Sequence, residues 1–219
     1  MSKILCLLVL LLSLSGCGPK AAPWLSEGYQ RLENFKTDFL TGRPAAVTEA
    51  QFRKAAEEIK KSGDLDLLGK VWLTRMALQI AVLAEPEEGE FSRVDAAEPV
   101  PANRNFLRFL RGDPAAEEAL LPERYRGVLP SLRGGTTSEL SVIIEKLDDH
   151  LSRLIVAGIA VRGNRESEPL FLLAVETASR NGWKRALLAW LKRLESFYGA
   201  SGEAAKAASV RRRIEVIAP

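Results

Sequence analysis

The chain has 219 residues, 47% of them hydrophobic, and its 31 Lys and Arg against 28 Asp and Glu give a formal net charge of +3. Acidic and basic residues are interspersed along the whole chain, which excludes the one-signed basic surface typical of nucleic-acid-binding proteins. A chain of about 200 residues can bury roughly 70% of its unfolded surface, so a hydrophobic core can stabilise it without disulfides.

The first residues have the pattern of an export signal. Lys3 precedes an apolar run over residues 4–12, and the small residues Ser15 and Gly16 follow. A positive start, a short apolar core and small residues before a cleavage site are typical of a secretory signal peptide. A transmembrane helix is the alternative, but it needs roughly 20 apolar residues. The sequence therefore predicts that residues 1–16 are removed on export.

The residues at the predicted cleavage site are Leu14-Ser15-Gly16-Cys17. They resemble the lipobox of bacterial lipoproteins, although a plain secretory signal would share the small residues. The resemblance implies cleavage between Gly16 and Cys17, a diacylglycerol on the Cys17 sulfur, and a fatty acid such as palmitate on the new amino terminus. Several acyl chains on one cysteine anchor a protein stably in a membrane.

The same resemblance predicts where the anchored protein is located. The residue after the cysteine is Gly18 rather than aspartate, which in lipoproteins of two-membrane bacteria favours the outer membrane, facing the periplasm. A host with a single membrane would keep the protein on the outer face of that membrane. Cleavage would remove Lys3 and Cys6, which lowers the formal charge from +3 to +2. With Cys17 lipidated, no thiol is left for a disulfide, a nucleophile or a metal site.

Residues 17–23 are small or proline-rich and predict a lipidated tether, followed by a single all-helical domain over 24–219. Within 24–84, hydrophobic residues recur at the three- and four-residue steps of helices. Thr48 is expected to cap the second of these helices with Gln51 as its capping-box partner. We expect residues 48–84 to form a helical hairpin.

The helical pattern weakens over residues 85–103, where Pro86, Pro99 and Pro101 occur among several acids. This composition predicts an extended, solvated linker that is mobile, although a loop this long can also be functional. It separates the N-terminal helices from the C-terminal helices of 104–219.

The C-terminal part is expected to begin with short helices and to continue with longer ones. The predicted ranges are 103–111, 114–120, 122–132, a long central helix from Thr136 or Thr137 to Val161, 168–180, 183–198 and 203–217. Asp113-Pro114 is a typical helix start. No segment has the alternating pattern of a strand. The sequence predicts an all-α fold of antiparallel helical hairpins, either an α-solenoid or an irregular helical bundle.

The last two predicted helices resemble a tetratricopeptide (TPR) unit over residues 188–219. Its characteristic positions hold Leu194, Tyr198, Gly202, Ala207 and Pro219, whereas Glu195 and Arg211 depart from the family pattern. The resemblance implies a helix–turn–helix unit of an α-solenoid. A generic antiparallel helix pair is the alternative, because such repeat patterns are degenerate.

A search for chemistry finds no catalytic residues, no metal site and no cofactor. His150 is the single histidine, and a lone histidine without other ligands is a poor metal site. The adjacent acids Glu57-Glu58, Glu87-Glu88, Glu117-Glu118 and Asp148-Asp149 point in different directions on a helix. The basic run at 211–213 is expected to be a solvated helix face, with anionic lipid as the alternative partner.

The sequence therefore predicts a non-enzymatic, lipid-anchored interaction protein. The resemblance to TPR-bearing outer-membrane lipoproteins implies a helical surface that binds another, unidentified envelope protein. We expect Trp72, Trp183 and Trp190 to supply binding contacts wherever they are exposed. The alternatives are a peptidoglycan-acting enzyme that uses a carboxylic acid, and a small-ligand carrier with a cavity among the helices around 140–160.

Overall fold

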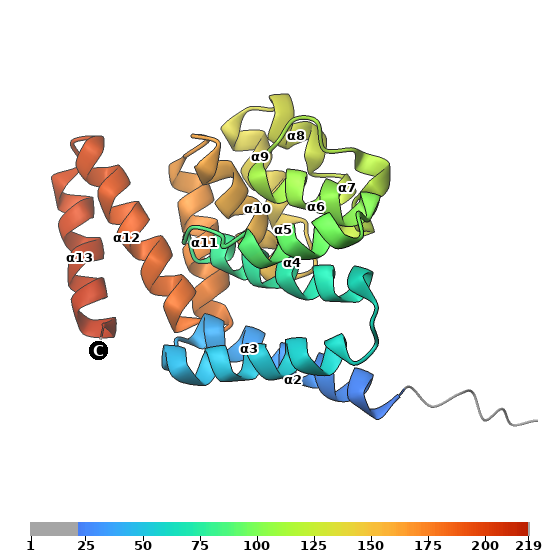
Figure 1. Cartoon of the computed structure of the whole chain (residues 1–219). Coiled ribbons are helices and arrows are strands. Elements are labelled where there is room, and N and C mark those ends of the chain that lie inside the picture. Colours follow the sequence, from blue (N-terminus) through green and yellow to red (C-terminus); the bar gives the residue numbers. More distant parts are fainter. Residues whose placement is uncertain (1–21, 219) are drawn as a thin grey trace, which may run out of the picture.

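A computed structural model describes residues 22–218, which are helical almost throughout and contain no strand (Figure 1). The predicted all-α class is confirmed, and the helices form a bundle with a solenoid-like stacking. The elements are α2 (Pro23–Thr41), α3 (Ala45–Lys60), α4 (Leu65–Ala81), α5 (Gly89–Ala97), α6 (Pro101–Arg111), the 3₁₀ turn η2 (Glu118–Leu120), α7 (Glu123–Arg126), α8 (Leu129–Gly134), α9 (Thr137–Glu145), α10 (His150–Arg162), α11 (Glu168–Arg180), α12 (Lys184–Ala200) and α13 (Ala204–Ile217). The predicted signal segment, Cys17 and most of the tether lie outside the described residues.

Helices α2 and α3 form a tight antiparallel pair at the bottom of Figure 1. The pair is close because Gly28 has no side chain: a Cβ atom there would lie 2.9 Å from Ile59 Cδ1. Helix α3 packs more extensively on α2 than on α4, although α3 and α4 are the two helices predicted over 48–84 and do contact each other. Phe52 of α3 still contacts α4, with its ring 4.8 Å from that of Trp72.

Helices α4 and α10 form the centre of the core. Every residue from 76 to 82, where α4 ends, is buried. The same is true of every residue from 154 to 160 in α10. The two helices approach at Gly158, where a Cβ atom would lie only 2.4 Å from the carbonyl oxygen of Ile80. A glycine is therefore required at this crossing, because real side chains do not tolerate such a distance.

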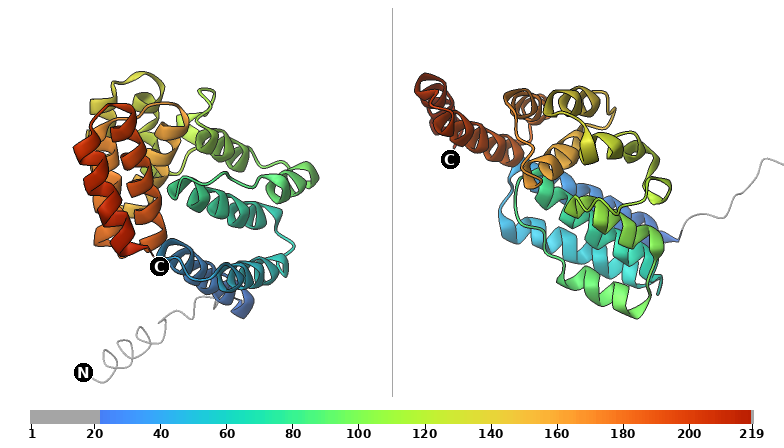
Figure 2. Two further views of the ribbon diagram at one scale, coloured as in Figure 1. Left: turned by 90° about the vertical axis from the view of Figure 1, so that its left-hand side faces the viewer. Right: turned by 90° about the horizontal axis from the view of Figure 1, so that it is seen from above.

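The last three helices stack one after another at the edge of the molecule, and the α12–α13 pair extends from the body (Figure 2, right). Gly182 and Gly202 adopt left-handed backbone conformations, with φ of 66° and 75°, in the turns between these helices. Left-handed residues after a helix end favour glycine. The helices predicted over 168–180, 183–198 and 203–217 are confirmed to within two residues.

The segment predicted as a mobile linker over 85–103 is instead ordered around a helix. Helix α5 occupies Gly89–Ala97, and α6 begins at Pro101. Phe91 of α5 is buried, and the backbone at Gly69 of α4 leaves room for its ring. A single anchoring aromatic residue in a short polar helix gives little periodic signal, so sequence analysis missed this element.

The predicted helix over 114–120 is reduced to the 3₁₀ turn η2. Asn105 explains the difference: its Nδ2 donates to the Glu117 carbonyl oxygen at 2.8 Å, and its Oδ1 accepts from the Glu117 N–H at 2.6 Å. These two bonds occupy backbone groups that a helix would need. The Asp113 carboxylate accepts from the Ala115 N–H at 2.8 Å and forms a turn rather than a helix start.

Two further helix boundaries differ from the predictions. Helix α3 begins at Ala45 directly after Pro44, so Thr48 lies inside the helix and its hydroxyl donates to the Ala45 carbonyl oxygen instead of capping with Gln51. The range predicted as 122–132 is divided into α7 and α8, because Pro130 in the first turn of α8 favours a new helix start.

The long helix predicted from Thr136 to Val161 is broken into α9 and α10. Thr136 does cap α9, in a complete capping box with Glu139. Asp149 then caps α10, its carboxylate accepting from the Ser152 N–H at 3.0 Å, and an aspartate cap can start a helix without glycine or proline before it.

Candidate binding groove

Three neighbouring cavities share lining residues with one another, and we call the series that they form the α4–α7 groove. The first cavity, of about 510 Å³, lies between α4 and α6 on one side and the η2–α7 segment on the other. The second, of about 230 Å³, shares Thr74, Phe106 and Arg124 with the first. The third, of about 360 Å³, shares Lys36 and Asp149 with the second and ends at α2 and the start of α12.

The floor of the first cavity is hydrophobic. Leu73 of α4 and Leu121 of the η2–α7 segment are buried beneath it, and Phe106 of α6 is half-buried. Phe106 is supported from below by Tyr125 and Phe109, with ring centroids 5.6 Å and 5.9 Å away. Packing against two aromatic rings favours a floor that is formed before a ligand arrives, as is usual for binding sites.

One polar residue of this floor is held in a fixed orientation. Asn103 is buried, and its Nδ2 donates to the backbone carbonyl and the carboxylate of Asp66 at 3.1 Å and 3.0 Å. A Cβ atom at Gly69 would lie 2.8 Å from this Nδ2. Asn103 is therefore positioned by α4 on two sides.

The rim of the first cavity is basic, and no carboxylate lines it. Lys70 pairs with Asp66 at 2.6 Å on the surface of α4. Arg126 donates to the carbonyl oxygens of residues 119 and 121 and stabilises the η2–α7 turn. Arg124 lies over the Tyr125 ring at 5.1 Å and forms no ion pair with a carboxylate of the described residues.

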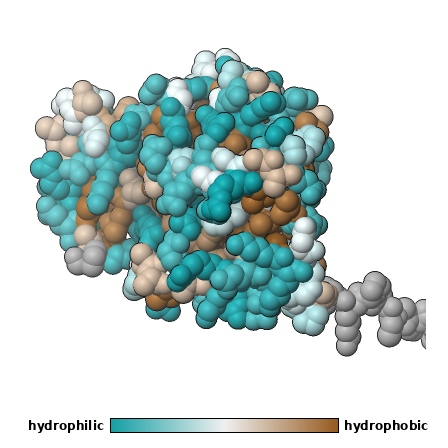
Figure 3. All heavy atoms as spheres, in the orientation of Figure 1, coloured by the Kyte–Doolittle hydropathy of each residue, from teal (hydrophilic) through white to brown (hydrophobic). Residues whose placement is uncertain are grey.

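A hydrophobic side chain also protrudes at this rim. Leu120, in the η2 turn, is 38% exposed beside the basic residues of the cavity. Sequence analysis did not single out Lys70, Leu120 or Arg124, because they come together only when α4 packs on the η2–α7 segment. Figure 3 shows hydrophobic residues among hydrophilic ones beside the start of α4, and others between α12 and α13.

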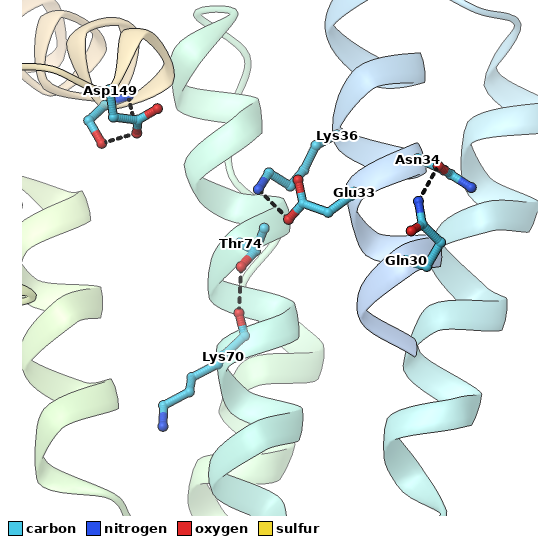
Figure 4. Close-up of polar contacts among 8 residues, drawn as sticks. Gln30, Glu33, Asn34, Lys36, Lys70, Thr74 and Asp149 are labelled. Carbon is cyan, nitrogen blue, oxygen red and sulfur yellow. Dashed lines mark hydrogen bonds and ion pairs between the residues drawn. The ribbon is translucent and has the colours of Figure 1, made fainter. Parts of the chain in front are cut away.

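The opposite end of the groove is acidic. Lys36 of α2 pairs with Glu33 at 2.7 Å and lines the second cavity together with Thr74 of α4 and Asp149 at the start of α10 (Figure 4). Asp148 and His150 line the third cavity with Asp149. The groove therefore has a basic first cavity and an acidic third cavity.

His150 is exposed in the third cavity and its Nδ1 lies 3.0 Å from Asn181 Oδ1. Within residues 22–218, no group of three or more His, Cys, Asp and Glu side chains is placed to hold a metal ion. His150 thus links the start of α10 to the end of α11 and has no partner that would make it a metal site.

The three tryptophans that the sequence suggested for partner binding differ in their exposure. Trp190 is completely buried, and its Nε1 donates to the Ala81 carbonyl oxygen at 2.9 Å, so it is a core residue and not an accessible one. Trp72 is half-buried against Phe52. Trp183 is half-buried and lines the third cavity, which makes it the one of the three that contributes to the groove.

The carboxyl groups with clearly shifted pKa values are stabilised in the charged form. A hydrogen bond from Arg111 lowers the pKa of Glu88, and the backbone and hydroxyl of Thr136 lower that of Glu139. Hydrogen bonds from Tyr198 and Lys206 lower the pKa of Glu168. A general acid for glycoside hydrolysis requires the opposite shift, a raised pKa.

A separate cavity of about 310 Å³ lies between α8 and the end of α10, near the region where the sequence suggested a ligand cavity. Its two arginines are already engaged: Arg165 donates to the carbonyl oxygens of Ser131, Leu132 and Gly135, and Arg133 donates to that of Ala116. These guanidinium groups stabilise the turns around α8, so several of their N–H donors are already occupied by backbone carbonyl oxygens.

The basic run at 211–213 lies in the exposed part of α13. Arg211 pairs with Glu195 of α12 at 2.6 Å, and Arg212 and Arg213 are exposed. Among the described helices none is long and apolar enough to span a membrane. Comparison of the chain with protein-family models, curated proteins and solved structures gives no match.

Proposed function

We propose that this chain is a non-enzymatic adaptor of the bacterial cell envelope, anchored by lipid on Cys17 to the periplasmic face of the outer membrane. It binds a segment of another envelope protein. The observation that carries the proposal is the α4–α7 groove, which combines a hydrophobic floor with basic side chains at a solvent-open rim. Grooves of this kind between helices bind peptide segments through hydrophobic anchors.

The anchor determines how the groove is presented. Cleavage at Gly16–Cys17 leaves residues 17–22 between the lipid and the start of α2 at Pro23. A fully extended chain spans at most about 3.5 Å per residue, so the start of α2 would lie within roughly 20 Å of the membrane surface. A partner would therefore be another protein of the same membrane or of the adjacent periplasm.

The C-terminal helices support the part of the proposal that concerns a repeat-like surface. In α12 and α13, Leu194, Tyr198 and Ala207 are buried between the helices, and Gly202 adopts φ of 75° in the turn. These are the roles that the resemblance to a TPR unit assigns to these positions. Stacked helical pairs of this type expose extended surfaces for protein partners.

A small-ligand carrier is the second candidate, because the first cavity is within the range of about 300–1,000 Å³ that small-molecule sites occupy. The cell-wall enzyme has no such observation in its favour, since the clearly shifted carboxyl pKa values are lowered. A ligand carrier would co-purify with a small molecule and give no protein adduct.

Chemical crosslinking and affinity capture of the full-length protein from native membranes test the proposal, with Cys17→Ala as the unlipidated control. We expect a stoichiometric envelope protein that is captured with the lipidated form and is lost or strongly reduced with the control. Clean isolation from membranes without any protein partner would contradict the adaptor function and favour the carrier.

A further inference from the structure

We infer that the α4–α7 groove binds an acidic peptide segment, in which a hydrophobic side chain enters the first cavity and flanking carboxylates pair with Lys70 and Arg124. This inference rests on the proposed adaptor function and specifies the chemistry of the partner.

The first cavity is shaped for a hydrophobic anchor. Its floor consists of Leu73, Leu121 and the half-buried Phe106, and Leu120 stands at its rim with 38% of its surface exposed. A partner side chain placed here would cover Leu120 and be shielded from water by the basic side chains around it. Central hydrophobic anchors surrounded by a polar rim carry most of the affinity in protein interfaces.

The charge of the rim selects a partner of opposite sign. Lys70, Arg124 and Arg126 line the first cavity, and no Asp or Glu does. Arg126 is engaged by two backbone carbonyl oxygens, whereas Arg124 lies over the Tyr125 ring without a carboxylate partner among the described residues, and Lys70 pairs with Asp66 at the surface of α4. Exposed pairs such as Lys70–Asp66 contribute little stability, so a partner carboxylate can compete for the lysine.

The other end of the groove explains where the acidic residues of the partner lie. Glu33, Asp148 and Asp149 line the third cavity against the single cation Lys36. Carboxylates of the partner would be repelled there and attracted at α7. The groove therefore fits a segment whose acidic residues lie over the first cavity and whose other end, toward Trp183, is neutral or basic.

Other cationic surfaces of the described chain lack this combination. The arginines of the cavity beside α8 are engaged by backbone carbonyl oxygens, and Arg212 and Arg213 are exposed on α13 away from the hydrophobic floor of the first cavity. The first cavity joins an open apolar floor to cations that are not engaged in the core. It is thus the position at which both the hydrophobic and the charged part of a peptide can be bound.

Fluorescence anisotropy with synthetic peptides tests the inference on the full-length protein in detergent. The probe is a labelled peptide that carries leucines among glutamates, and the controls replace its glutamates by lysines or its leucines by serines. We expect saturable binding of the acidic probe that weakens as salt is raised, because the Debye length shortens. Both control peptides should bind at least about tenfold more weakly.

Substitutions at the first cavity test whether the acidic probe binds there. Arg124→Gln and Lys70→Gln should each weaken the acidic probe about threefold, and about tenfold together. Leu120→Ser should weaken it about tenfold through loss of the anchor contact. Arg93→Gln on α5 and Val216→Ser on α13 are matched controls, because they change exposed residues that do not line the groove. Far-UV circular dichroism confirms that each variant is folded.

Three outcomes would overturn the inference. The first is equal binding of the acidic and basic peptides, and the second is binding that none of the groove variants alters. The third is binding of phosphatidylglycerol vesicles, but not of the acidic peptide, through Arg124 and Lys70. If membrane capture yields a protein partner in equal amounts with the wild-type protein and with the groove variants, the adaptor function stands and the groove assignment is wrong. If neither partner nor peptide binds, both are wrong.

Discussion

Trp190 and Ala81 are joined by a buried hydrogen bond across 109 positions of the sequence, from the indole Nε1 to the carbonyl oxygen at 2.9 Å. Ala81 is the last residue of α4, where carbonyl groups have no partner within the helix. The bond therefore satisfies the end of the central helix and fixes α12 to it. The stacked C-terminal helices are attached to the core through this contact.

Trp190→Phe should lower the free energy of unfolding by about 2–4 kcal/mol, because it leaves a buried carbonyl unsatisfied and a void beside it. Urea unfolding followed by circular dichroism measures the change. Trp24→Phe, at a half-buried position of the first turn of α2, is the matched control and should change stability by less than about 1 kcal/mol. Equal effects of the two substitutions would contradict the role of the hydrogen bond.

Gly158→Ala should destabilise the protein by about 1–3 kcal/mol or more, because the new Cβ would lie 2.4 Å from the Ile80 carbonyl oxygen and force α4 and α10 apart. Gly199→Ala is the control on another helix, since nothing lies within 4 Å of a Cβ atom there. It should stabilise α12 by up to about 1 kcal/mol through helix propensity. Thermal unfolding of both variants measures these two changes in stability, which should have opposite signs. A Gly158→Ala variant as stable as the wild-type protein would contradict the close crossing of α4 and α10.

Glu168 connects the last three helices in a pH-dependent manner. Its carboxylate accepts from Tyr198 Oη at 2.7 Å and from Lys206 Nζ at 3.0 Å. Burial and this carboxylate raise the pKa of Tyr198 to about 12, so the phenol is a donor throughout the neutral range. Both donors lower the pKa of Glu168.

Because the pKa of Glu168 is lower in the folded state, its stabilising contribution is present above the ordinary glutamate pKa and is lost as pH falls through the folded value. Glu168→Gln should therefore reduce stability near neutral pH and flatten its decline between about pH 6 and about pH 3. Urea titrations across this range measure the slope. Glu176→Gln, an exposed acid on the same helix, should leave the slope unchanged, and an unchanged slope for Glu168→Gln would contradict the linkage.

Mass spectrometry of the protein purified from membranes tests the predicted anchor. We expect a mature chain that begins at Cys17 and carries the mass of a diacylglycerol and an additional acyl group. Cys17→Ala should keep the folded body but leave the membrane fraction. A mature chain with a free Cys17 thiol, or one that begins elsewhere, would contradict the lipoprotein assignment.

The sequence predicted those elements whose signals are local. The helix ends before Gly182 and Gly202 are marked by left-handed glycines, and the helix start expected at Thr136 or Thr137 is marked by the Thr136 side chain, which caps α9. Elements that depend on distant partners were missed. Helix α5 exists because Phe91 packs beside Gly69 of α4, and η2 replaces a helix because Asn105 binds the backbone of Glu117.

The candidate groove could not be predicted for the same reason. Lys70 and Arg124 are 54 positions apart and belong to unrelated segments, so neither spacing nor composition associates them. Exposed tryptophans were a reasonable expectation for binding contacts. Trp190 does not meet that expectation, because it is completely buried. A large aromatic side chain stabilises a hydrophobic core as well as a protein interface.

The most direct test of the proposed adaptor is site-specific photocrosslinking of the lipidated protein in native membranes. A photoreactive residue replaces Ala119, which is exposed and lines the first cavity, and in the control it replaces Ala97 at the end of α5. The account predicts one adduct with an envelope protein from Ala119, through an acidic segment of that protein, and none from Ala97. The same adducts from both positions, or none from Ala119 in correctly anchored protein, would contradict it.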